Sequence, residues 1–189
     1  MKIIAAPENM TLVGMTISVD QSQSLSSAAS FASSTFIDDE AYKSWDGIKE
    51  MSPVTDGGYA SGKILLVNFD KWLSSRQALQ WAKEYRLRPV TLRTALGIGD
   101  KYPNLDKTLK VSPLAVVTLA AAYFKGVGFV VGIEWVGSSR GAKLYDVNDI
   151  YGPNCWFAFC RDQDKEGRRE WREPVWHTTM CLVPQLYPC

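Results

Sequence analysis

Five side chains are the chain's main candidates for nucleophilic catalysis or metal binding: Cys155, Cys160, Cys181, Cys189 and the single histidine, His177. No two cysteines have the Cys-x-x-Cys spacing that is typical of structural zinc sites. A Ser-His-Asp or Cys-His site would have to use His177, and the tail around it offers no orienting carboxylate. We therefore expect no catalytic residue of these types, no metal site and no cofactor.

The spacing of the first two cysteines also limits disulfide formation. Cys155 and Cys160 differ by an odd number of positions, so on one regular strand they point to opposite faces and cannot pair with each other. A bridge from one of them to Cys181 or Cys189 stays open. So do free thiols in a cytoplasmic protein.

The balance of charge disfavours nucleic acid as a partner. The chain has 21 Lys and Arg against 20 Asp and Glu, a net charge of +1, so no overall field attracts a polyanion. The densest charged run, residues 161–173, carries both signs and is typical of a solvated loop. Gly126, Gly128 and Gly132 follow a predicted strand but have neither dinucleotide-binding nor Walker spacing.

One stretch, residues 114–136, is apolar enough to be mistaken for a membrane span. Lys125 and Gly126 lie at its centre, where a lysine would cost a few kcal/mol in a bilayer. Val, Ile, Tyr, Phe and Trp flank these residues, which favours a buried β-hairpin. Residues 1–10 lack the apolar run of a secretory signal. We expect no membrane partner and a cytoplasmic or virion-associated protein.

The N-terminal third is predicted to contain a strand, an arm and a loop. Residues 11–19 alternate as a strand does. Residues 22–36 are rich in serine, which is typical of a flexible connection, but Leu25, Ala29, Ala32 and Phe36 have helical spacing. A flexible arm and a loosely packed helix both stay open. Residues 38–62 mix charge with Gly and Pro and predict a loop that Trp45 anchors by packing.

Two capped helices follow a strand predicted over residues 64–69. Gln77 stands three residues after Ser74, which is the pattern of a capping box at a helix start. The apolar stripe of this helix contains Ala78, Leu79, Ala82 and Tyr85. The helix ends before Pro89, because the residue that precedes a proline avoids the α region. Thr91 then caps a second helix, which Gly97 is predicted to close as a C-cap.

The passage SRQALQWAKEYRLRPVTLRTALGIGDKYP, residues 75–103, resembles the helix-to-helix passage of bacterial C-type-lectin-like domains. The similarity continues through strands expected at 116–121, 129–136, 143–147 and 155–161, the last ending in FAFCRD. The chain departs from this pattern at Thr94-Ala95-Leu96, where relatives have Glu-Leu, and after Arg161. The resemblance covers residues 63–161.

This resemblance implies an α+β fold, in which two helices pack on a small twisted antiparallel sheet with N- and C-terminal extensions. We therefore divide the chain into three parts. Residues 1–62 form the strand, arm and loop, residues 63–161 the C-type-lectin-like core, and residues 162–189 a charged loop and Pro-rich tail packed on the core.

The resemblance also implies that ligands bind at the irregular loop between the last strands, which spans residues 145–156 here. The candidate binding residues are Tyr145, Asp146, Asn148, Asp149, Tyr151, Asn154 and Trp156. Aromatic side chains supply contact area at low entropic cost, and Asn and Asp supply adaptable hydrogen bonds. The same polar residues are common in ordinary turns, so a purely structural turn stays the alternative.

Two finer interpretations of this loop rest on the same resemblance. Val147-Asn148-Asp149 is similar to the Trp-Asn-Asp calcium triplet of sugar-binding lectins, but residues 137–141 contain no Glu-Pro-Asn partner. One triplet cannot supply the six to eight oxygens that calcium needs, so we do not expect calcium. The content of Asn, Asp and Tyr resembles the variable surface of bacterial and phage proteins that retroelements diversify.

The sequence thus favours a non-enzymatic recognition module with a protein or glycan ligand. One alternative is a cysteine-dependent enzyme of the formylglycine-generating type, which would need two cooperating thiols of lowered pKa. Another is a structural or assembly protein of a phage, in which the Ser-rich arm and Pro-rich tail contact neighbours. Homo-oligomers stay open in both non-enzymatic interpretations.

Overall fold

The computed structural model describes residues 2–4, 10–20, 22–33, 45–50, 59–124 and 127–161. Its elements, in chain order, are β1 (Lys2–Ile4), β2 (Thr11–Asp20), α1 (Leu25–Ala32), the 3-10 helix η1 (Trp45–Gly47), β3 (Lys49–Glu50), β4 (Tyr59–Asn68), β5 (Leu73–Ser74), α3 (Ser75–Glu84), β6 (Leu87–Pro89), α4 (Leu92–Lys101), α5 (Leu105–Leu109), β7 (Leu114–Phe124), β8 (Val127–Val136), β9 (Ser139–Asp146), β10 (Ile150–Tyr151) and β11 (Cys155–Arg161). The predicted tail over 162–189 and most of the predicted loop over 38–62 lie outside the described residues.

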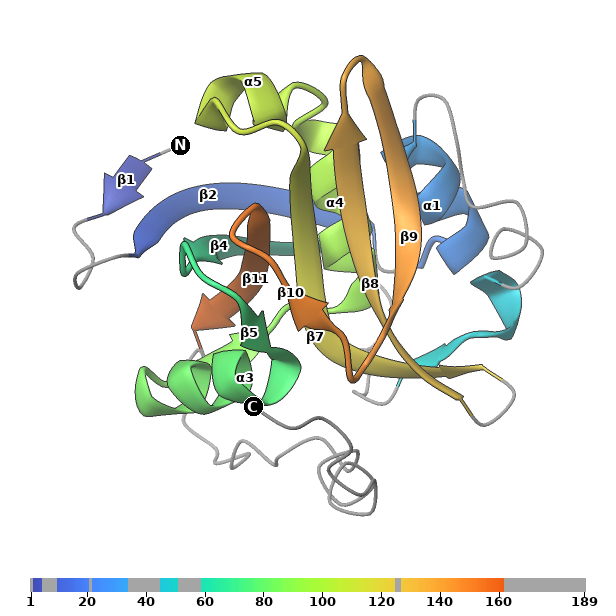
Figure 1. Cartoon of the computed structure of the whole chain (residues 1–189). Helices are drawn as coiled ribbons and strands as arrows, with labels where there is room; N and C mark the ends of the chain where they lie inside the picture. Colours follow the sequence, from blue (N-terminus) through green and yellow to red (C-terminus); the bar gives the residue numbers. More distant parts are fainter. Residues whose placement is uncertain are drawn as a thin grey trace.

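A mixed sheet in the order β1-β2-β4-β11-β7-β8-β9 forms the body of the protein (Figure 1). Neighbouring strands are antiparallel except β11 and β7, which run parallel. β3 pairs with β7, and β6 pairs with the C-terminal half of β11. β5 and β10 form a separate two-stranded ribbon. The predicted hairpin over residues 114–136 is confirmed as β7 and β8.

The central strands β7 and β11 bury both of their alternating sets of side chains, which are largely apolar, whereas Thr16 and Ser18 on β2 are exposed. On β11, Trp156 and Ala158 join the core under α1 and α4, whereas Phe157 and Phe159 join the core under α3 and the β5–β10 ribbon. Trp45 is fully buried in the first of these cores, which confirms its predicted packing role.

The two predicted helices are confirmed, and their relative placement was predicted wrongly. α3 begins at the expected capping box of Ser74 and Gln77, and the Thr91 side chain caps α4. The helices lie on opposite faces, because the connecting strand β6 runs in the plane of the sheet beside β11. An α+β fold with two helices on a small antiparallel sheet is therefore wrong; the protein is mostly β, with a mixed sheet that is covered on both faces.

α4 packs against β2 toward one end of the sheet and against β7, β8 and β9 toward the other; in Figure 1 it is seen behind β7 and β8. Two glycines on α4 allow this approach. A Cβ on Gly97 would lie 2.6 Å from the Val19 side chain, and one on Gly99 would lie 2.9 Å from the Ala32 carbonyl oxygen. Gly97 therefore lies inside α4, and its prediction as a C-cap was wrong: without a Cβ it lets the Val19 side chain of β2 lie close to the helix.

The Ser-rich segment forms helix α1, which packs on α4 and against the edge strand β9. Its serines face outward or cap the helix, while Leu25, Ala28, Ala29 and Ala32 are buried. The Ser24 side chain accepts a hydrogen bond from the Ser27 main chain at the start of the helix. This segment thus contributes to the core that it shares with α4.

Candidate functional site

The polar residues of the predicted binding loop hold a turn between β9 and β10. Asp149 Oδ2 accepts a hydrogen bond from the Asp146 main-chain nitrogen at 3.1 Å. Asp146 Oδ1 accepts bonds from the Asn148 main-chain nitrogen at 2.8 Å and from Asn148 Nδ2 at 3.1 Å. All three side chains are exposed. They shape the turn by the local bonding that Asn and Asp favour, and they also form part of the surface.

Tyr145 points away from solvent and belongs to a half-buried polar cluster. Its hydroxyl donates to Glu134 Oε1 at 2.7 Å, and Lys143 Nζ donates to the same oxygen at 3.1 Å. A Cβ on Gly132 would lie 2.7 Å from the Tyr145 ring, so the glycine makes room for this ring. Burial raises the pKa of Tyr145, which keeps the phenol protonated as a donor to Glu134.

Tyr151 and Trp156, two of the predicted binding residues, lie in the core of the free protein, where a ligand on the surface does not reach them. Each is 4% exposed. The Tyr151 ring meets Phe157 edge to face, with ring centroids 5.3 Å apart, and burial raises the pKa of its phenol. Trp156 packs on the opposite face, under α4. These aromatic side chains stabilise the fold through buried area, because inward-facing positions of β10 and β11 carry them.

Two other side chains form the outer surface of this region. Trp72 is 70% exposed and Ile150 is 65% exposed, on the outer side of the β5–β10 ribbon. A Cβ on Gly152 would lie 3.2 Å from the Trp72 ring, so the indole lies over that glycine. Trp72 and Ile150 were not among the predicted binding residues, because only the pairing of β5 with β10 brings them together. We call Trp72, Ile150 and Gly152 the ribbon surface.

Buried hydrogen bonds fix the two segments that carry the ribbon surface. Asn68, itself buried, donates from Nδ2 to the carbonyl oxygens of Pro153 and Cys155. Asn68 Oδ1 accepts from the Asp70 main-chain nitrogen at 3.0 Å, which supports the left-handed backbone of Asp70 at φ 50. Ser75 Oγ donates to the Val147 carbonyl oxygen at 2.8 Å. The ribbon surface therefore stands on a rigid base.

The two described cysteines cannot act as a pair. Cys155 lies in the core under α3, and Cys160 packs against the core under α4, as the odd spacing predicted. Burial raises the pKa of the Cys155 thiol, the opposite of the lowered value that a reactive thiol needs. Cys181, Cys189 and His177 lie outside the described residues.

The described part of the chain contains no group of three or more His, Cys, Asp or Glu side chains that could hold a metal ion. Asn148 and Asp149, which the calcium interpretation would use, hold the turn instead. Asn154 is exposed directly before β11, and its carbonyl oxygen accepts a hydrogen bond from the Ala115 main-chain nitrogen at 3.3 Å.

Comparisons with protein-family models, curated proteins and solved structures found no match to this chain. The resemblance to bacterial C-type-lectin-like domains is tested by none of them and stays a prediction. Among the helices that the structure describes, none is long and apolar enough to cross a membrane.

Proposed function

We propose that the chain is a non-enzymatic recognition module that binds a protein partner through the ribbon surface. The observation that carries this proposal is the outward display of Trp72 and Ile150, at 70% and 65% exposure, from a base fixed by buried hydrogen bonds. Folding gains little from two large apolar side chains left in water, whereas a partner that covers them gains their full burial.

The composition of the ribbon surface favours a protein over a glycan. Trp is enriched among the residues that dominate the energy of protein interfaces. Ile150 adds aliphatic area, which matches an apolar side chain better than the hydroxyl groups of a sugar. Exposed polar side chains lie close to Ile150 along the chain, at Asp146, Asn148, Asp149 and Asn154, and an apolar centre with a polar rim is the usual anatomy of a protein interface.

The rigid base lowers the cost of binding. Immobilising a mobile side chain or loop on association costs free energy, and a surface that is already ordered avoids part of that cost. Asn68, Ser75 and the pairing of β5 with β10 supply this order before a partner arrives. Rigidity is also what a diversified variable protein needs, since exposed residues can then change without changing the scaffold.

The retroelement interpretation adds a separate expectation to this proposal. Sequences closely related to this chain should differ at the exposed positions Asp146, Asn148, Asp149, Ile150 and Asn154. They should keep the buried positions Tyr151 and Trp156 unchanged. Equal variation at exposed and buried positions of residues 145–156 would remove the interpretation and leave the binding proposal in place.

Quantitative affinity purification from the native host, followed by calorimetry with the purified partner, tests the proposed function. Trp72→Ala and Ile150→Ala should each weaken binding by about 1 to 4 kcal/mol, the range of interface anchors, and leave the melting temperature unchanged. Val136→Ala is the matched control, because Val136 is an exposed apolar residue on β8.

Two results would contradict the proposal. Binding partners that are retained equally by the wild type and by Trp72→Ala would place recognition elsewhere. Loss of binding to an array of glycans on Trp72→Ala, with no protein partner affected, would make the ligand a carbohydrate.

A further inference from the structure

The outer edge of β2 is only partly paired among the described residues. β4 pairs with β2 along its whole length, from Thr11 to Asp20. On the other edge, β1 pairs antiparallel with Leu12, Val13 and Gly14 only. The edge of β2 beyond Gly14 therefore has main-chain groups without a described strand partner. This second surface is independent of the ribbon surface.

The hydrogen bonds of β2 identify which of its residues face outward. In an antiparallel strand, the N–H and C=O of one residue point to the same side, and successive residues alternate. The Thr16 carbonyl oxygen accepts a bond from the Tyr102 hydroxyl at 2.7 Å, so it points away from β4. By the same alternation Ser18 and Asp20 also present their main-chain groups outward.

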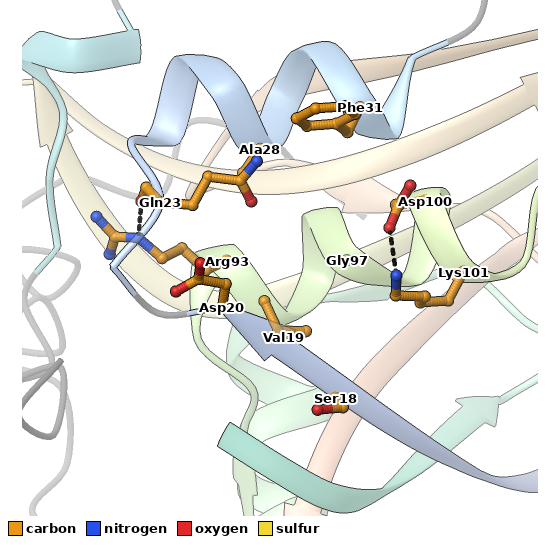
Figure 2. A pocket seen from close by; sticks show the side chains of 10 residues that line it. All are labelled: Ser18, Val19, Asp20, Gln23, Ala28, Phe31, Arg93, Gly97, Asp100 and Lys101. Carbon is orange, nitrogen blue, oxygen red and sulfur yellow. Dashed lines mark hydrogen bonds and ion pairs between the residues drawn. The ribbon is translucent and has the colours of Figure 1, made fainter. Parts of the chain in front are cut away.

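A hollow of about 450 Å³ lies beside this edge, between β2, α1 and α4. Figure 2 shows α1 and β2 on its two sides and Gly97 of α4 between them. Phe31, which is 60% exposed, projects from α1. The hollow thus has a sheet edge on one side and an apolar ring on the other.

The charges that line the hollow are balanced. Lys101 Nζ lies 3.0 Å from Asp100 Oδ2, and Arg93 Nε donates to the Gln23 carbonyl oxygen at 2.7 Å. Asp20 accepts hydrogen bonds from the main chain and side chain of Ser22. Because these charges have partners within the chain, the lining favours an occupant without net charge.

We propose that an extended, uncharged peptide segment of a partner protein adds as a strand to β2 alongside Ser18 to Asp20, beyond the Thr16 carbonyl oxygen that Tyr102 already bonds. Main-chain hydrogen bonds to Ser18 supply affinity, and one alternating set of side chains enters the hollow, with an apolar residue against Phe31. Strand addition at an open edge is a common mode of peptide recognition. The same edge already accepts β1, so the segment extends a pairing that exists.

The geometry favours a single segment over a second copy of the chain. α1 forms the opposite wall of the hollow, so an incoming strand has to fit between β2 and α1. A second copy that offered its own β2 would bring its own α1 to the same place, and the two helices would collide. A free peptide segment carries no such helix.

Ser18→Pro removes the outward N–H and tests the proposal directly, since proline is tolerated on a sheet edge where no ladder bond is lost. Ser18→Ala keeps the N–H and is the matched control. The probe is a phage-displayed library of random heptapeptides without charged residues, selected on the wild-type chain. Selected peptides should bind Ser18→Ala within about twofold of wild type and Ser18→Pro at least tenfold more weakly.

Hydrogen exchange gives a second measurement that does not depend on the variant's fold. The Ser18 amide should exchange rapidly in the free chain and at least tenfold more slowly with a selected peptide bound. The proposal would be overturned if Ser18→Pro bound the selected peptides as tightly as the wild type does. It would also be overturned if the Ser18 amide were protected from exchange in the free chain, or if the selection gave no peptide whose binding Ser18→Pro weakens. A dimer in light scattering that Ser18→Pro dissociates would assign the edge to a second copy instead. Trp72→Ala should leave peptide binding unchanged, which separates this proposal from the ribbon surface.

Discussion

The two edges of the main sheet differ in how the chain treats their free main-chain groups. At β9, Ser33 Oγ accepts a bond from the Ala142 main-chain nitrogen at 3.0 Å, and Arg140 Nε donates to the Ala32 carbonyl oxygen. On the outer edge of β2, past the residues that pair with β1, the bond that the structure describes is the one from the Tyr102 hydroxyl to the Thr16 carbonyl oxygen. α1 packs against β9, whereas at β2 it forms only the opposite wall of the hollow.

This difference suits a sheet in which α1 protects the β9 edge against pairing with other chains while the β2 edge stays open for the proposed peptide. Open edges are liabilities that proteins usually cover. Asp149 contributes to the protection as well, since its carboxylate accepts from the Asp146 nitrogen at the end of β9. Because the described residues bond the outer main-chain groups of β9 and not those at the end of β2, the β2 edge is the one that we propose for the added peptide strand.

The largest expected effect comes from proline at the closed edge. Ala142→Pro should lower the free energy of unfolding by about 3 to 5 kcal/mol, because it removes the donor to Ser33 and forces a ring into a fully buried site. Ser18→Pro, at the corresponding outward position of β2, should cost about 1 kcal/mol or less. Urea unfolding of both variants measures the contrast, and equal costs would remove the distinction between the edges.

Substitution of the two glycines of α4 should also cost more stability on the closed side of the sheet than on the β2 side. Gly99→Ala should destabilise the protein by about 2 kcal/mol, because the new methyl group meets the Ala32 main chain and Ile133. Gly97→Ala should stay within about 1 kcal/mol of wild type, since Val19 can shift toward the hollow and alanine favours the helix. Thermal unfolding compares them. A larger loss at Gly97 would show that the β2 side is packed as tightly as the β9 side.

Removing the Ser33 hydroxyl, which accepts the bond from the Ala142 main-chain nitrogen, should have a smaller effect on stability. Ser33→Ala leaves the Ala142 nitrogen without its acceptor, which should cost about 1 to 2 kcal/mol. Amide exchange at Ala142 should accelerate at the same time. Ser18→Ala provides the matched change at the open edge and should alter neither stability nor exchange. Unchanged exchange at Ala142 would mean that Ser33 does not close the β9 edge.

The smallest effect concerns Asp20 at the mouth of the hollow. Hydrogen bonds from the side chain and main chain of Ser22 lower the pKa of Asp20 below its ordinary value of 3.8. A lowered folded-state pKa stabilises the fold above that value and loses its contribution as the pH falls through the folded pKa. An NMR titration of Asp20 should give a midpoint below 3.8, which Ser22→Ala should move part of the way back. An Asp20 midpoint that is the same in Ser22→Ala as in the wild type would show that Ser22 does not lower the pKa of Asp20.

The sequence by itself determined the elements whose signals are local. The capping box of Ser74 and Gln77, the cap at Thr91 and the hairpin over residues 114–136 depend on neighbours a few positions away. The opposite faces of Cys155 and Cys160 followed from strand alternation alone. Each of these features forms in the structure as expected.

Only the tertiary structure decided how these elements combine. β11 inserts between β4 and β7, and β6 carries the chain from one face of the sheet to the other, so a helix pair expected on one face lies on two. Burial of Tyr151 and Trp156, exposure of Trp72 and Ile150, and the position of Gly97 inside α4 depend on contacts between distant residues. Alternation indicates that one set of side chains faces inward, but pairing between distant strands decides which set that is.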